Sequence, residues 1–120
     1  MKVAVTSQAQ DINGQVDARF GRCQFFIIAD PATLEYEAFE NPAITASGGA
    51  GIQAAQFVAH KGVDAVISGN FGPKAHQTLV AAGVKMYSAH TRTVREALED
   101  YRKGTLPSVS SPTAAEHSGL

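Results

Sequence analysis

Hydrophobic positions form short runs and helical stripes that alternate along the chain. Apolar runs and one alternating segment predict five strands, over residues 2–7, 23–30, 33–40, 63–68 and 84–87. The alternating segment suits an edge strand with one wet face, and Asp30-Pro31 before it predicts the turn of a β-hairpin.

Three other segments carry apolar residues at helical spacing. The predicted helices cover residues 50–61, 73–82 and 94–104. Pro73 is a favoured first helical residue, and a glycine stands at or just after each predicted end. In chain order these elements predict an α/β fold, namely a mixed five-stranded sheet with an antiparallel hairpin, flanked by three helices.

Length limits the chain to one domain. With 120 residues it is long enough for one hydrophobic core and too short for two, which excludes a multidomain enzyme. We expect a single domain over residues 1–107. The polar composition after Pro107 predicts a flexible C-terminal tail over residues 108–120.

The charge and cysteine content narrow the partners and the compartment. Ten basic against eleven acidic residues give a net charge of -1, so we expect neither a nucleic-acid nor a membrane partner. A single cysteine, Cys23, cannot form an intramolecular disulfide, which favours a reducing compartment. The first ten residues lack the apolar length of a signal peptide or membrane span. The expected location is cytoplasmic.

The loop before the second strand is the first candidate site. Arg19 and Arg22 flank Phe20-Gly21 and precede Cys23, and two guanidinium groups on one loop can cradle an anion. The alternative is structural: Asp17 pairs with one arginine, and Phe20 caps the core.

Two glycine-containing helix starts are the second candidate. Gly49-Ala50-Gly51 and Gly72 precede or open helices whose free N–H groups and dipole favour an anion, and Lys74 adds a cation. A dinucleotide site is a weak interpretation, because seven residues separate the preceding strand from the glycines. The alternative is that the glycines only permit tight helix starts.

Catalytic and zinc chemistry find little support. The four histidines are never three or four residues apart, and one cysteine completes no zinc motif. No nucleophile elbow or carboxylate pair is present to activate a nucleophile. We therefore expect a protein that is not an enzyme.

Five motifs occur in one register along the chain. They are MKVAVTS at 1–7, VDARFGR at 16–22, GAGIQAAQ at 49–56, GVDAVI at 62–67 and TVREAL at 93–98. Together, over about residues 1–107, they resemble the dinitrogenase iron–molybdenum cofactor biosynthesis family.

The resemblance implies a ribonuclease H-like fold without nuclease chemistry. It also implies a non-catalytic protein that binds or carries a preassembled metal–sulfur cluster. Some members deliver iron–molybdenum cofactor or its precursor, and the small stand-alone members include one that holds a molybdenum–copper sulfide cluster. The implied partners are the metal–sulfur cluster, cofactor-biosynthesis proteins and a P-loop ATPase.

One departure from the family pattern bears on how a cluster is held. Members tied to nitrogenase cofactor commonly have His-Phe-Gly where this chain has Arg19-Phe20-Gly21. The resemblance then implies non-covalent binding of a polyanion by the arginine loop, Lys74 and the two glycine turns. Cys23 is either a soft metal ligand or a small buried hydrophobe. The competing function is a regulatory scaffold that binds a P-loop ATPase without a cluster.

Overall fold

The computed structural model describes residues 1–113 of the chain. Its elements are β1 (Val3–Ser7), β2 (Phe25–Ala29), β3 (Tyr36–Glu40), α1 (Ala50–His60), β4 (Ala65–Ser68), α2 (Pro73–Ala81), β5 (Lys85–Ser88) and α3 (Val94–Lys103). These are the five strands and three helices that the hydrophobic pattern predicts, within a few residues at each end.

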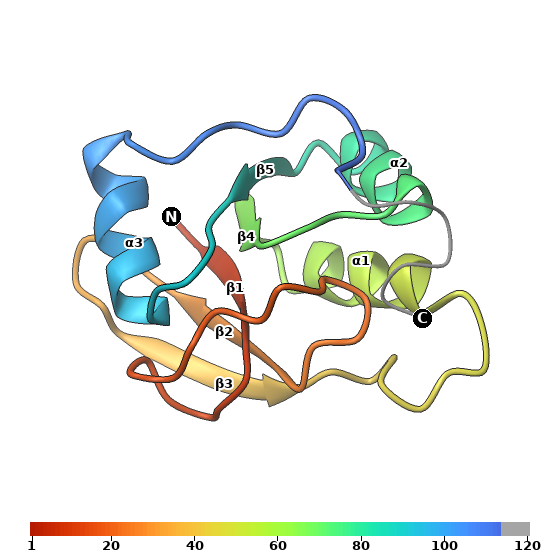
Figure 1. Cartoon of the computed structure of the whole chain (residues 1–120), viewed down its shortest axis with the longest axis horizontal. Helices are drawn as coiled ribbons and strands as arrows, with labels where there is room; N and C mark the ends of the chain where they lie inside the picture. The colour runs from red at the N-terminus through yellow and green to blue at the C-terminus, as the bar shows by residue number, and fades with distance from the viewer. Residues whose placement is uncertain (114–120) are drawn as a thin grey trace.

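A single mixed sheet forms the centre of the molecule (Figure 1). The strand order is β3-β2-β1-β4-β5, with β1, β4 and β5 parallel and β2 antiparallel to both β1 and β3. Strand β3 is largely exposed and forms one edge, as its alternating sequence predicts. The structure thus has the predicted mixed five-stranded sheet, and the ribonuclease H-like assignment stays a prediction.

Helices cover both faces of the sheet. Alternate residues of β1 point to opposite faces, so Ala4 joins the core beneath α1 and α2, while Val3 and Val5 join the core beneath α3. Figure 1 shows α1 and α2 together on one side and α3 alone on the other. All five residues of β1 are buried, as expected for a central strand covered on both faces.

The chain continues past α3 along the outer side of β5. The Val109 N–H donates to the Met86 carbonyl at 2.9 Å, which extends the sheet by one short contact. Further on, Thr113 and Phe71 exchange two hydrogen bonds, at 2.9 and 3.0 Å. The segment 107–113 is therefore hydrogen-bonded both to β5 and to Phe71, just before α2.

This segment differs from the tail that composition predicts. Residues 108–113 make backbone hydrogen bonds to the body of the domain, so the packed part of the chain extends past residue 107. Polar composition hid these contacts because they are made by backbone groups, which every sequence has. The prediction for residues 114–120 lies outside the described residues.

Candidate functional site

All three helices begin at the same edge of the sheet. The parallel strands β1, β4 and β5 end there at Ser7, Ser68 and Ser88, and α2 and α3 follow β4 and β5 directly. Strand β3 runs in the same direction as β1 and leads into α1 at this edge. In open α/β sheets, ligands bind outside the carboxyl ends of the strands, so this edge is the first place to search.

The start of α3 is sealed by the protein itself. Thr93 and Glu96 form a capping box, in which each side chain accepts a hydrogen bond from the other residue's N–H, at 3.1 and 2.9 Å. The Val94 and Arg95 N–H groups donate to carbonyls of the loop after β1, at 2.9 and 2.8 Å. No donor of this first turn is left for a ligand.

The starts of α1 and α2 are open by comparison. Their N-cap residues are Gly49 and Gly72, which provide no capping side chain, and neither first turn holds an acidic residue. Within residues 1–113, the first N–H groups of these helices have no acceptor. Gly51, Ile52 and Lys74 are at least partly exposed, whereas Ala50 and Ala75 are buried. Such groups attract an anion, because they combine free donors with the positive end of the helix dipole.

Close packing brings the two open starts together. A Cβ placed on Gly51 would lie 3.3 Å from the Ala75 Cβ, and one on Gly21 would lie 3.1 Å from the Gly51 nitrogen. The predicted glycines of the arginine loop and of α1 therefore meet each other and α2. Their small size serves this packing, whereas the Cα of Gly48 faces open space, with nothing within 4 Å of a Cβ placed there.

The arginine loop is anchored against the end of β4. The Phe20 N–H donates to the Asn70 carbonyl at 3.3 Å, and a Cβ on Gly69 would lie only 2.6 Å from the Ala18 Cα. Phe20 itself is 1% exposed, and its ring centre lies 5.4 Å from that of Phe71. Phe20 thus fills the core, as the structural alternative expected, and does not line the surface.

The two predicted arginines have different surroundings. Arg22 donates from Nη1 to the Ile44 carbonyl at 2.9 Å and from Nη2 to the Ala46 carbonyl at 2.6 Å. It therefore fastens the loop that leads into α1. The Arg19 side chain is 56% exposed and lies 3.8 Å from the Asp17 carboxylate. Of the two, Arg19 is the cation that faces solvent.

Cys23 does not face the open edge. Its side chain is fully buried, and burial, followed by the nearby Asp17 carboxylate, raises the pKa of the Cys23 thiol far above its usual range. The Asn41 amide contacts the sulfur at 3.6 Å. A protonated thiol in the core is a poor metal ligand, so the surroundings match the small buried hydrophobe of the two alternatives.

Asn41 is a structural residue of the site that sequence reasoning missed. Its Nδ2 donates to the carbonyls of Gly21 and Cys23, both at 3.0 Å, and it is 1% exposed. Asn41 therefore ties the arginine loop to the segment before α1. The available signal was Asn41-Pro42, which the sequence alone identified only as the end of the hairpin.

The edge as a whole offers positive charge and N–H donors. Lys74 is exposed at the second position of α2, and Arg19 is exposed on the neighbouring loop. Within residues 1–113, no three His, Cys, Asp or Glu side chains gather in a way that could hold a metal ion. The chemistry that this arrangement provides is recognition of an anion by charge and by backbone hydrogen bonds.

Comparison with known proteins identifies the family of this chain. The sequence profile described as dinitrogenase iron-molybdenum cofactor matches residues 1–104. The chain belongs to the dinitrogenase iron-molybdenum cofactor family. The family resemblance drawn from the five motifs is confirmed, and the match includes both the arginine loop and the two open helix starts.

Individual relatives are similar to this chain over most of their length. The apo form of the orange protein from Desulfovibrio gigas is 40% identical, with a TM-score of 0.90 over 94% of this chain and 96% of that one. A Thermotoga protein of the DUF35 family is 36% identical, with a TM-score of 0.81 over 94% and 97%. An uncharacterized protein of Methanocaldococcus jannaschii is 33% identical over 78% of this chain and 82% of its own length.

No helix in the described part of this family member is long and apolar enough to cross a membrane. Its fold agrees with that of the orange protein and of the Thermotoga protein.

Proposed function

We propose that this protein is a non-catalytic carrier for an anionic, molybdenum-containing metal–sulfur cluster. The cargo is a molybdenum–copper sulfide or an iron–molybdenum cofactor precursor. It is held at the open edge by the free N–H groups of α1 and α2 and by the charges of Arg19 and Lys74.

One observation carries this proposal: among residues 1–113, two adjacent helices begin without an acceptor for their first N–H groups, while the third, at the same edge, is sealed. Unsatisfied helix N-termini bind anions, and a polyanionic thiometallate presents sulfide acceptors over its whole surface. The family membership supports the choice of this anion over a phosphate or carboxylate.

The residues present fit an anion better than a directly ligated metal. Arg19 and Lys74 supply two exposed cations, and Gly48 and Gly49 leave open space beside the α1 start. The buried, protonated Cys23 offers no thiolate to the surface. We therefore assign Cys23 to the core and the cluster to charge and hydrogen bonding.

The similarity to the orange protein adds support, because that protein has a described apo form and is 40% identical to this chain. The matched fold supports the proposal that this chain also carries a bound group.

The first experiment is an anaerobic titration of the purified protein with tetrathiomolybdate and Cu(I). Visible charge-transfer bands and metal stoichiometry are measured after desalting. We expect a defined molybdenum-to-copper ratio to be retained. No retention would overturn the molybdenum–copper form and direct the same assay to iron–molybdenum precursors. Failure there too would favour the scaffold that binds a P-loop ATPase.

A matched pair at Gly48 locates the cargo. A Cβ at this position meets no atom within 4 Å, so we expect both Gly48→Asp and Gly48→Asn to leave the fold intact. The carboxylate of the Asp variant repels an anion at the α1 start, while the Asn variant has nearly the same shape without the charge. Loss of retention in the first alone supports the site. Equal retention in both would place the cluster elsewhere.

A further inference from the structure

A cavity lies at the edge of the sheet opposite to the helix starts. Its volume is about 680 Å³, within the range of small-molecule sites. It is bounded by the start of β1, the turn after β2 and the end of α3, far in the chain from the open helix starts. Its lining includes Met1, Asp30, Pro31, Tyr87, Tyr101 and Arg102.

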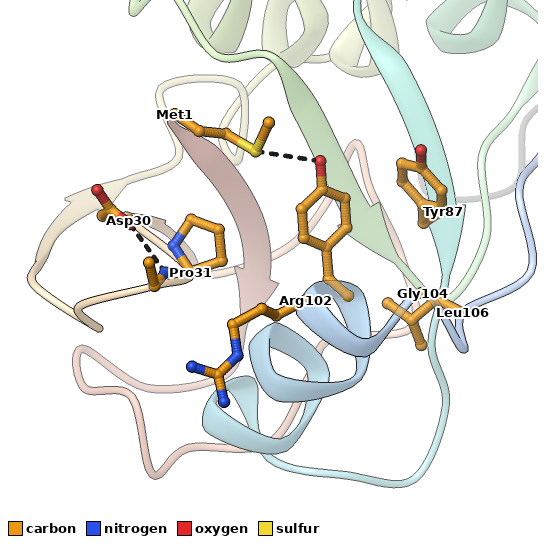
Figure 2. Close-up of a pocket in the computed structure, with 9 residues that line it drawn as sticks. Met1, Asp30, Pro31, Tyr87, Arg102, Gly104 and Leu106 are labelled. Carbon is orange, nitrogen blue, oxygen red and sulfur yellow. Dashed lines mark hydrogen bonds between the residues drawn. The ribbon is translucent and has the colours of Figure 1, made fainter.

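The walls of this cavity are largely aromatic and apolar. The rings of Tyr87 and Tyr101 meet edge to face, with centres 5.1 Å apart, and Pro31 is buried on the other side. Figure 2 shows Pro31 on one side of the cavity and Tyr87 on the other. A flat apolar group fits beside such rings, because aromatic pairs favour offset or edge-on contact.

Two opposite charges at the cavity are unpaired with each other. Among the described residues, no ion pair within 4.0 Å joins Asp30 to Arg102, and the Arg102 guanidinium makes no hydrogen bond. One oxygen of Asp30 accepts the Ala32 N–H at 2.8 Å, which fixes the turn. The other oxygen and the guanidinium are left for a ligand.

Tyr101 provides a weakly engaged donor on the Met1 side of the cavity. Its hydroxyl donates to the Met1 sulfur at 3.4 Å, and a thioether is a weak acceptor. Burial, followed by Tyr87 and Asp64, raises the pKa of Tyr101, so the hydroxyl keeps its proton at neutral pH. A ligand oxygen is a better acceptor than the sulfur and can replace it.

We propose that this cavity binds a small zwitterion with an aromatic side chain, of the α-amino acid class. The ligand carboxylate faces Arg102, the ammonium faces Asp30, and the ring lies between Pro31 and the tyrosines. A negative and a positive group on one apolar cavity complement a molecule that carries both charges and a ring. The proposal is independent of the cluster, because the two sites lie at opposite edges of the sheet.

The test is an NMR titration of the full chain with L-phenylalanine, following the ring resonances of Tyr87 and Tyr101. Three analogues each remove one feature: phenylacetate lacks the ammonium, phenethylamine lacks the carboxylate, and glycine lacks the ring. We expect saturable shifts with phenylalanine and an affinity at least about threefold lower for each analogue, as the loss of a partly exposed ion pair or ring contact gives. Absence of saturable shifts, or equal affinity for all four compounds, would overturn the proposal.

Charge-neutral variants give a second readout. Asp30→Asn retains the oxygen that caps the turn, and Arg102→Gln retains most of the side-chain length. Each is expected to weaken phenylalanine binding by at least about threefold. Lys103→Gln, the adjacent basic residue outside the cavity, is the control and should leave the affinity unchanged. Equal affinity in all three variants would contradict the assigned charges, whatever the outcome of the cluster titration.

Discussion

The start of α3 and the starts of α1 and α2 are built differently on one sheet edge. Val94 and Arg95 donate to carbonyls of the loop after β1, and Thr93 and Glu96 complete a capping box. The first free N–H groups of α1 and α2 have no acceptor within residues 1–113. A helix start at the carboxyl end of a strand is therefore not by itself a candidate site. It becomes one only where its first N–H groups have no acceptor in the described part of the chain.

The two halves of the loop after β1 contact different helix starts. Its first half, through Gly14, closes the α3 start, and its second half, from Asp17 to Arg22, packs against β4 and the α1 start. One loop thus seals one helix and borders the opening at two others. Substitutions at the residues that each half contacts therefore disturb one set of helix starts and not the other.

The largest expected effect comes from breaking the contact that holds the second half in place. Gly69→Ala puts a Cβ 2.6 Å from the Ala18 Cα, so backbone must move. We expect a loss of about 2 kcal/mol or more in the free energy of unfolding, measured by denaturant titration, together with loss of cluster retention. Gly48→Ala, which meets no atom within 4 Å, is the control. Equal stability of the two variants would contradict the tight loop contact.

The next effect is the dependence of stability on pH through the buried Cys23 thiol. Because burial raises the pKa of Cys23, the folded state holds the thiol proton more tightly than the unfolded state. Stability from this group is complete below the unfolded thiol pKa of about 8.5 and falls above it, by up to about 1.4 kcal/mol per pH unit. Denaturant titrations at pH 8 and 10 should show a smaller decline for Cys23→Ala than for the unmodified chain.

The same variant tests the assignment of Cys23 to the core. Cys23→Ala should retain the cluster wherever it remains folded. Loss of the cluster from a stable Cys23→Ala protein would identify the thiol as a ligand instead.

A smaller effect is expected at the sealed helix. Thr93→Ala removes the side chain that accepts the Glu96 N–H, which costs about 1 kcal/mol of stability. Cluster retention should not change, because α3 contributes no free donor to the proposed site. Thermal or denaturant unfolding measures the first quantity, and desalting after metal loading measures the second. A reduced retention would mean that the sealed start also takes part in binding.

The smallest stability change is expected at the open start of α2, with an opposite sign for binding. Lys74→Glu places an acid in the first turn, where it complements the helix dipole, and should stabilise the protein by about 0.5 kcal/mol. The same change should weaken cluster retention, because it replaces an attractive charge with a repulsive one. Lys74→Gln should fall between the unmodified chain and Lys74→Glu, both in stability and in cluster retention. Parallel changes of stability and retention would contradict a role for Lys74 in binding.

The sequence predicted the fold closely because each element carries its own signal. The continuous apolar run of β2, the alternation in β3 and the apolar stripe of α3 are local patterns with distinct periods. The attachment of residues 108–113 was not predictable in this way. Those hydrogen bonds involve backbone groups, and their partners are set by where β5 and α2 lie.

The candidate site was predicted in part. Charge and glycine content located the arginine loop and the two glycine turns, and the structure brings Gly21, Gly51 and Ala75 together. The separate roles of Arg19 and Arg22 could not be read from the sequence, since both are arginines on one loop. Only the carbonyls of Ile44 and Ala46, distant in the chain, distinguish them.

By itself, the sequence determined the order and type of the elements, the family and the residues that could attract an anion. These follow from local periodicity, from turn and cap chemistry and from motifs that span only a few residues. The tertiary structure alone decided which helix starts are sealed, which arginine faces solvent and whether Cys23 is buried. Each of those depends on an acceptor or a neighbour supplied by another part of the chain, and no local pattern encodes that partner.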